Sequence, residues 1–484
     1  MSQSDPPVKV PLHVRTNDQA GEICVTDGLF RPVAAGIGNL SVDLPRGVYK
    51  VKAREGFAEK EDFVILRDEP VTRSFTIRFS SPIPLNDTAE QDPLHIGAIQ
   101  EHCARAHFCA GEGSSIFVFE RCWGCGITPI ANRRVMDSLN LHTATGELIV
   151  ALGKRAYRSG EVNPWAACSV EVRPGAYRLT GTTFKGSPIE HTVMAVPGYQ
   201  TQIYLMCRTT PHGEVAGNDL PDATVVYARE RTFDPDSRDR RLAELARLGL
   251  RTDRNVLPDD TVSEILAGTF RDPILGLHGA HLITRLRRPD ATDLKLTIAR
   301  LRQFLGPAHP DVEALTLYPG GTPTSFAFTV PPPMKKSWLL VVEASARNPA
   351  LVPRDSVSAR VARDLSADEP WLFWSPDDGG KQSANDALKQ ALNTVAAHIN
   401  LGKISKPPAT LVGSVANFAV MKWLWSMKRS AAAPGTEAKL PQADSALLKS
   451  AVSEATIEAL VNTLRLPRGN VEQMIENFKK VVGK

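Results

Sequence analysis

One segment of this chain occurs twice. Residues 41–51 read Ser-Val-Asp-Leu-Pro-Arg-Gly-Val-Tyr-Lys-Val, and residues 169–179, which start 128 positions later, read Ser-Val-Glu-Val-Arg-Pro-Gly-Ala-Tyr-Arg-Leu without a gap. The serine, the first valine, the glycine and the tyrosine are identical in the two copies. A repeat at a fixed offset indicates that a fold contains similar units. The sequence therefore predicts two related domains in the N-terminal half, and it constrains the architecture more than the function.

Short strand-like segments separated by turn residues surround each copy of the repeat. Strands at regular spacing with turns between them are typical of β-sandwiches. We expect Gly47 and Gly175 to shape the same tight turn, with a positive φ at Gly47. Tyr49 and Tyr177 should then occupy equivalent packing positions. The predicted strands are 8–14, 21–26, 40–44, 48–53, 61–66 and 71–78 in the first unit, and 114–120, 138–143, 147–152, 168–172, 177–182, 191–196 and 201–207 in the second.

The two units resemble a known class of repeat. A Pro-containing turn, a Gly-x-Tyr sequence, a strand and then Gly56-Phe57 or Gly198-Tyr199 are similar to PEGA and carboxypeptidase-regulatory-like repeats. The resemblance covers roughly residues 8–80 and 114–207. It implies non-catalytic binding or spacer modules, many of which are extracytoplasmic.

The periodicity becomes helical after about Thr232. Asp234 and Pro235 are expected to provide an N-cap and a proline at the first helical position. Further helices are predicted around residues 262–266, 274–286, 294–305, 333–347 and 355–365, with one strand-like interruption at 324–330. The predicted fold class is thus multidomain α+β, with two tandem antiparallel β-sandwiches, an all-α domain and a basic helical tail. The expected boundaries are 8–80, a connector 81–113, 114–209, 232–378, and 383–484 with a linker near 430–444.

The charge of the chain is unevenly distributed. Residues 381–484 contain 14 Lys and Arg against 7 Asp and Glu, whereas the whole chain has a formal net charge of +4. A basic region could meet nucleic acid, an anionic membrane or an acidic partner, but a solvated basic helical surface is the more common case. The first residues show no basic segment followed by an apolar one, so we expect a cytoplasmic protein without a secretory signal.

Cysteines and histidines gather before and after residue 114. A Cys-x-x-Cys-Gly sequence at 122–126 has the form of a zinc knuckle. The spacing between the first two cysteines does not have that form, and cytosolic cysteines are commonly buried small hydrophobes. We therefore predict no metal site and leave zinc as an alternative. The candidate ligands are His102, Cys103, His107, Cys109, Cys122 and Cys125.

Other catalytic patterns are weak or absent. His278 and His281 lie on one helical face, but no Glu occupies the position that a metalloprotease helix requires, which favours a packing role. A Cys–His dyad could form from distant residues such as Cys168 and His191, although nothing local singles them out. No nucleophile elbow, phosphate-binding loop or dinucleotide fingerprint occurs. The sequence predicts no catalytic, cofactor-binding or metal-binding residue.

Two C-terminal segments leave alternatives open. The apolar helix expected at 409–425 ends in Lys422-Trp-Leu-Trp-Ser-Met-Lys428, and it could touch a membrane interface or lie in a core. Residues 453–480 have the spacing of a helix-turn-helix, but the second helix is acidic where a recognition helix meets phosphate. We favour a core helix in the first case and a hairpin for packing or protein docking in the second.

These features together favour a non-enzymatic interaction protein. We expect a bacterial-type scaffold, adaptor or accessory subunit of an effector or regulatory complex, which holds a protein partner through sandwich edges and loops. The alternatives are a hydrolase with dispersed Cys and His residues, and a nucleic-acid-associated regulator that acts through 381–484. The sequence does not identify the partner or the oligomeric state.

Overall fold

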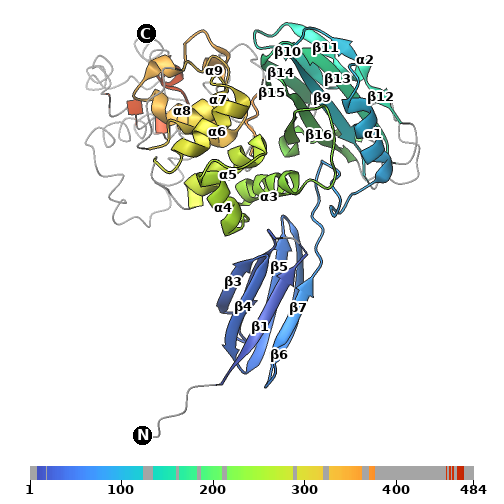
Figure 1. Cartoon of the computed structure of the whole chain (residues 1–484). Helices are drawn as coiled ribbons and strands as arrows, with labels where there is room; N and C mark the ends of the chain where they lie inside the picture. Colours follow the sequence, from blue (N-terminus) through green and yellow to red (C-terminus); the bar gives the residue numbers. More distant parts are fainter. Residues whose placement is uncertain are drawn as a thin grey trace, which may run out of the picture.

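The chain is a mixed α+β protein, with sheets in its N-terminal half and helices in its C-terminal half (Figure 1). The linker near 430–444, the 409–425 segment and most of 383–484 lie outside the described residues. The computed structural model describes residues 8–17, 19–123, 135–159, 163–182, 187–209, 215–286, 292–319, 326–361 and 370–375, and near the C-terminus 454, 457–458, 461–462 and 466–473.

The first β-unit contains seven strands in the order β6-β5-β2-β3-β4-β1-β7. β3 and β4 are joined in this order by a single pair, Ile37–Asn39. Buried Leu12, Val25, Val51 and Val64 come from β1, β2, β5 and β6 and form one core cluster. β1 and β7 pair in parallel, so the expectation of a purely antiparallel unit is wrong. The strands are β1 Lys9–Thr16, β2 Glu22–Thr26, β3 Pro32–Ile37, β4 Asn39–Pro45, β5 Gly47–Glu55, β6 Ala58–Leu66 and β7 Val71–Phe75.

The second β-unit repeats this connectivity. One sheet has the order β11-β10-β14-β15, which matches β3-β2-β5-β6, and β13-β9-β16 in the other sheet matches β4-β1-β7. β9 and β16 pair in parallel, as β1 and β7 do. The elements are β8 Phe108–Cys109, β9 Ser114–Arg121, β10 Asn140–Thr143, β11 Leu148–Ala151, α2 Leu152–Arg155, β12 Tyr157–Arg158, β13 Trp165–Val172, β14 Gly175–Thr182, β15 Pro188–Ala195, β16 Gln200–Thr209, β17 Val215–Asn218 and β18 Thr224–Ala228.

The sequence repeat marks the same corner in both units. The Tyr49 hydroxyl donates to the Pro45 carbonyl at 2.8 Å, and the Tyr177 hydroxyl donates to the Arg173 carbonyl at 2.7 Å. Both bonds reach four residues back along the chain, which confirms that the tyrosines are equivalent. The expected positive φ at Gly47 is wrong, because φ is positive at Gly175 (+151°) but not at Gly47, which opens β5.

Removing either hydroxyl should weaken its unit. Tyr49→Phe and Tyr177→Phe each delete one partly buried hydrogen bond and leave a carbonyl to find another partner, which corresponds to about 1 kcal/mol. We expect the free energy of unfolding from denaturant titration to fall by about that amount in each variant. An unchanged free energy in both variants would show that the corner bond does not stabilise the fold.

Within the connector expected at 81–113, the chain forms the helix α1 (Pro93–Cys103). Asp92 caps the helix by accepting from the Leu94 N–H, and Pro93 takes the first helical position. The helix packs on β13 and β9. The segment before α1 is held by the fully buried Arg121, whose guanidinium donates to the carbonyls of Ser81, Pro82 and Glu90 at 2.7, 2.9 and 2.6 Å.

Most of the helices share a hydrophobic core with the second β-unit, and a separate core cluster surrounds Trp338 and Val342. Ile203 and Tyr227 from the strands belong to the same cluster as Leu245 and Leu282 from the helices. The first long helix begins at Arg238 after Ser237, so the expected start at Asp234 is wrong. The helices are α3 Arg238–Thr252, α4 Asp259–Leu266, α5 Pro273–Leu286, α6 Lys295–Leu305, α7 Pro310–Leu315, α8 Lys335–Ser345 and α9 Val357–Arg360, with short 3-10 turns at Leu220–Asp222 and Pro349–Leu351.

A short extended segment, residues 370–375, lies between the second β-unit and α8. We call it the strap. Its Trp371 indole N–H donates to the Ala223 carbonyl at 2.6 Å, and its Leu372 N–H donates to the Pro333 carbonyl at 2.8 Å. The strand expected at 324–330 is not present in its described part, 326–330.

The first β-unit contacts the helices through one end. Arg241 of α3 bonds to the buried Glu55 carboxylate at 3.2 Å, and Arg254 donates to the Gly56 carbonyl at 2.6 Å. Gly56 has a φ of +57°, and a Cβ there would lie 2.6 Å from Leu248, so the close approach requires glycine. The opposite end of this unit therefore points away from the helices (Figure 1).

Candidate functional site

The outer face of the β6-β5-β2-β3 layer is the strongest candidate surface of the first β-unit. Side chains alternate along β5, so that Tyr49, Val51 and Ala53 face the core. The intervening side chains face outward, and those of β6 do the same. The outward residues are Val48, Lys50, Lys52 and Arg54 on β5, and Glu59, Glu61, Phe63 and Ile65 on β6.

The half of this face nearer the helices is charged and internally paired. Lys50 meets Glu61 at 2.6 Å, Lys52 meets Glu59 at 2.6 Å, and Arg54 meets Glu59 at 3.1 Å. Hydrogen bonds from Lys52 and Lys50 lower the pKa of Glu59 and Glu61 respectively. Exposed pairs of this kind add little stability, but they neutralise one another. This half therefore presents no strong net charge to a ligand.

The half away from the helices is apolar and exposed. Val48 is 51% exposed and Ile65, its partner across the strands, is 56% exposed, while Phe63 is 62% exposed. The β2–β3 turn adds Leu29 and Phe30, each 71% exposed, at the same end. A Cβ on Gly28 of this turn would lie 3.9 Å from the Val48 carbonyl oxygen, which places the turn beside β5. We call these five apolar residues the tip patch.

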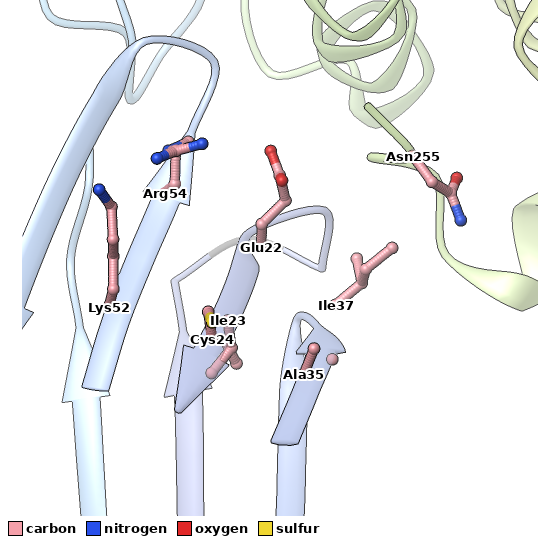
Figure 2. A pocket seen from close by; sticks show the side chains of 9 residues that line it. Glu22, Ile23, Cys24, Ala35, Ile37, Lys52, Arg54 and Asn255 are labelled. Atoms are coloured by element: carbon pink, nitrogen blue, oxygen red, sulfur yellow. The ribbon is translucent and has the colours of Figure 1, made fainter. Parts of the chain in front are cut away.

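A cavity of about 490 Å³ lies on the same layer, beside the charged half (Figure 2). Glu22, Cys24 and Ile37 line it from β2 and β3, Lys52 and Arg54 line it from β5, and Asn255 closes it from the helical side. Burial raises the pKa of Glu22, which Arg254 opposes from 3.1 Å. The lining offers one thiol and no imidazole, so it holds no Cys–His pair.

The cysteines of the zinc alternative have separate surroundings. The Cys103 thiol donates to the Arg231 carbonyl at 3.0 Å, and Cys109 is exposed and donates to the Gly111 carbonyl. Cys122 is buried beside Cys207, one position beyond the Arg121–Met206 pair of β9 and β16. Cys125 lies outside the described residues, so the Cys-x-x-Cys alternative stays untested there.

Cys207 also meets a carboxylate that the sequence did not single out. Its thiol donates to Glu120 Oε1 at 3.5 Å, while Glu120 Oε2 has no partner in the described structure. Burial raises the pKa of Glu120 to about 7, and burial together with Cys122 and Glu120 raises the pKa of Cys207. Thiols in such surroundings are poor nucleophiles, because the thiolate is disfavoured.

The histidines of the zinc alternative pack against each other beneath an exposed tyrosine. The ring centres of His102 and His107 are 5.5 Å apart, and Tyr157 stacks on His102 at 4.7 Å. The Ser169 N–H donates to His107 Nδ1 at 3.1 Å, which places the proton of the neutral ring on Nε2. A metal would need a free lone pair on that nitrogen. Within the described ranges, no group of three or more His, Cys, Asp or Glu residues could hold a metal ion.

The residues considered for hydrolysis lie apart. Cys168 is buried in β13, where burial raises its pKa to about 12. His191 is on β15 in the other sheet, where its Nδ1 meets the Leu372 carbonyl at 3.0 Å and its ring stacks on Phe373. The contacts of both side chains are therefore those of core residues.

The His278–His281 pair is used for packing. His278 Nδ1 meets the Ala243 carbonyl at 3.0 Å, and His281 Nε2 meets Ser337 Oγ at 2.9 Å. Asp311, which the sequence did not single out, bonds to Ser337 rather than to the histidine. In a hydrolytic triad the acid orients the histidine. Ser337 is fully buried, so this chain of polar groups is structural.

The described residues of the 453–480 segment pack on α8 and the chain that follows it. Val461 and Val471 are buried in one cluster with Trp338 and Val342 of α8. Glu472 bonds to Arg354 at 3.1 Å. These contacts fit the packing interpretation.

Among the described residues, no helix is long and apolar enough to cross a membrane. No protein-family model matches this chain, and no curated protein is significantly similar to it.

Proposed function

We propose that this chain is a non-enzymatic interaction subunit that presents its first β-unit to a partner protein. The second β-unit and the helices act as the body, because most of the helices share one core with that unit. The observation that carries the proposal is the tip patch, whose five large apolar side chains are 51–71% exposed at the end away from the helices. Exposed apolar residues gathered in one place are typical of protein-binding surfaces.

We also assign both β-units to the PEGA and carboxypeptidase-regulatory-like class as part of this proposal. Support comes from the matched strand orders and from the equivalent bonds of Tyr49 and Tyr177. Modules of this class imply binding or spacing rather than catalysis. The separation of Cys168 from His191 and the paired charges around the cavity add no support for the hydrolase alternative.

One substitution that introduces a charge into the tip patch tests its role. Phe63→Glu places a carboxylate at the centre of the patch, where burial against a partner would be strongly unfavourable. In affinity captures from the source cells, we expect the recovered partner protein to fall at least about tenfold relative to the unaltered chain.

Leu296→Glu on α6 is the matched control, because Leu296 is also exposed, at 59%, but lies outside the patch. It should leave recovery unchanged. Equal recovery with Phe63→Glu and with the unaltered chain would contradict the proposed function.

A further inference from the structure

The two β-units have equivalent edge strands. Tyr49 pairs with Val64 between β5 and β6, and Tyr177 pairs with Val193 between β14 and β15, which aligns β6 with β15. The alignment places Glu61 of β6 at the position of Glu190 in β15. Both carboxylates bond to the basic residue that follows the repeated tyrosine, Lys50–Glu61 at 2.6 Å and Arg178–Glu190 at 2.5 Å.

The edge of the second unit is occupied by the strap. The Glu190 N–H donates to the Trp374 carbonyl at 2.8 Å, and the Trp374 N–H donates to the Glu190 carbonyl at 3.1 Å. The Trp374 indole N–H also donates to Glu190 Oε2 at 3.0 Å. Glu190 therefore binds the strap through its backbone, as a single antiparallel β-bridge, and through its side chain, with Trp374 as an aromatic anchor.

The equivalent edge of the first unit ends the strand order at β6. Because N–H direction alternates along a strand, the N–H and C=O of Glu61 point away from β5, as those of Glu190 do. The Phe63 N–H points the same way and is covered by its neighbour, the Asp62 carboxylate, at 2.8 Å. β6 thus offers the hydrogen-bonding groups that the strap uses in β15.

At two equivalent positions, the outward side chain is exposed on β6 and buried on β15. Phe63 is 62% exposed, whereas Thr192 at the equivalent position is fully buried. Ile65 is 56% exposed, whereas the equivalent Met194 is 9% exposed. The second unit therefore buries these positions within the chain, and the first unit leaves them uncovered.

We propose that the β6 edge takes an extended segment of a partner protein, with a tryptophan opposite Glu61. Its backbone would pair with Glu61, its indole N–H would donate to the Glu61 carboxylate, and its ring would lie on Phe63. The partner segment would be uncharged, because Glu59 and Glu61 already pair with Lys50, Lys52 and Arg54 on this face. This inference rests on the proposed function and names how the partner is held.

A labelled hexapeptide with the strap sequence Pro-Trp-Leu-Phe-Trp-Ser tests the edge directly. Its binding to the full chain is followed by fluorescence anisotropy. Glu61→Pro removes the outward N–H and the carboxylate, and an edge strand tolerates proline at such a position. We expect it to weaken binding at least about tenfold, and Glu61→Thr, which keeps the N–H, to weaken it severalfold.

Glu59→Thr is the matched control on the same strand and face, and it should leave the affinity unchanged. Hydrogen exchange of the unaltered chain should show protection of the Glu61 N–H when the peptide is added, which needs no variant to fold. Absence of binding, or equal affinity for all three variants, overturns the inference. If Phe63→Glu loses the cellular partner while Glu61→Pro and Glu61→Thr retain it, the proposed function holds and strand addition at β6 fails.

Discussion

Lowering the pH from 6.5 to 5 should make this chain several kcal/mol less stable. Among the described histidines that are only 1–3% exposed are His191, His278, His281 and His309. Burial lowers their pKa values, to about 4 for the first two and to about 3 for the last two. Unfolding returns each ring to water, where its pKa is near 6.5. The unfolded chain then binds four protons between these limits that the folded chain does not bind.

Buried acids oppose this effect in part, and Asp272 is one of them, because burial raises its pKa. Burial raises the pKa of Asp311 and of Glu120 to about 7, so the folded chain keeps two protons below that pH that the unfolded chain releases. As the pH falls, the raised pKa values of these acids stabilise the folded chain, whereas the lowered pKa values of the histidines destabilise it. Among these six groups with pKa values of about 3, 4 or 7, the difference of four and two leaves about two protons taken up on unfolding, which corresponds to about 3 kcal/mol per pH unit near pH 5.

The slope can be measured by denaturant unfolding at several pH values between 5 and 7. His309→Gln should reduce it by about one proton, or about 1.4 kcal/mol per pH unit. Glutamine can still accept from the Tyr227 hydroxyl, which meets His309 Nε2 at 3.0 Å. A free energy of unfolding that stays constant or increases toward pH 5 would contradict the prediction.

Local sequence patterns predicted features that depend on contacts between residues close together in the chain. The repeated Gly-x-Tyr located the corner where Tyr49 and Tyr177 bond four residues back. The signals for α1 were also present, since Asp92 and Pro93 form an N-cap and a first-turn proline. They were missed because the nearby Cys and His residues suggested metal chemistry instead.

Contacts between distant residues could not be predicted in this way. Cys122 meets Cys207 rather than Cys109, because β9 and β16 pair in parallel across the unit. Trp374 meets Glu190 across 184 positions, and no periodicity records that pairing. The tip patch was likewise invisible, because alternation along β5 and β6 predicts an outward face but not whether another element covers it.

The outward edge residues are buried in the second unit and exposed in the first, because the second unit packs against the helices and the strap. Helices and strap bury the outward edge residues of the second unit, and Met194 belongs to its shared core. The first unit contacts α3 only through the Glu55 end among the contacts described here. The proposed function therefore rests on the places where the two copies differ, which are β6 and the tip patch.

The second large effect should come from Arg247, which joins three parts of the fold. Its side chain is fully buried, and it donates two bonds of 2.8 Å to Glu244 and one of 2.7 Å to Asp222. Glu244 also accepts from Ser81 at 2.8 Å and from Thr224 at 2.9 Å. Burial alone would lower the pKa of Arg247, but Glu244 and Asp222 outweigh it and raise the pKa. The network thereby ties α3 to the start of the connector and to β18.

Arg247→Met should therefore lower the free energy of unfolding by about 3–5 kcal/mol, because it leaves the buried Glu244 carboxylate without its counter-charge. Adding Glu244→Gln should restore part of that loss, since the double variant no longer buries an uncompensated charge. Arg251→Met is the matched control on the same helix, because Arg251 also bonds to Asp222, at 3.0 Å, but is 26% exposed. We expect it to cost less than about 1 kcal/mol. Similar losses for Arg247→Met and Arg251→Met in denaturant unfolding would show that burial of the pair, and hence this junction, does not control stability.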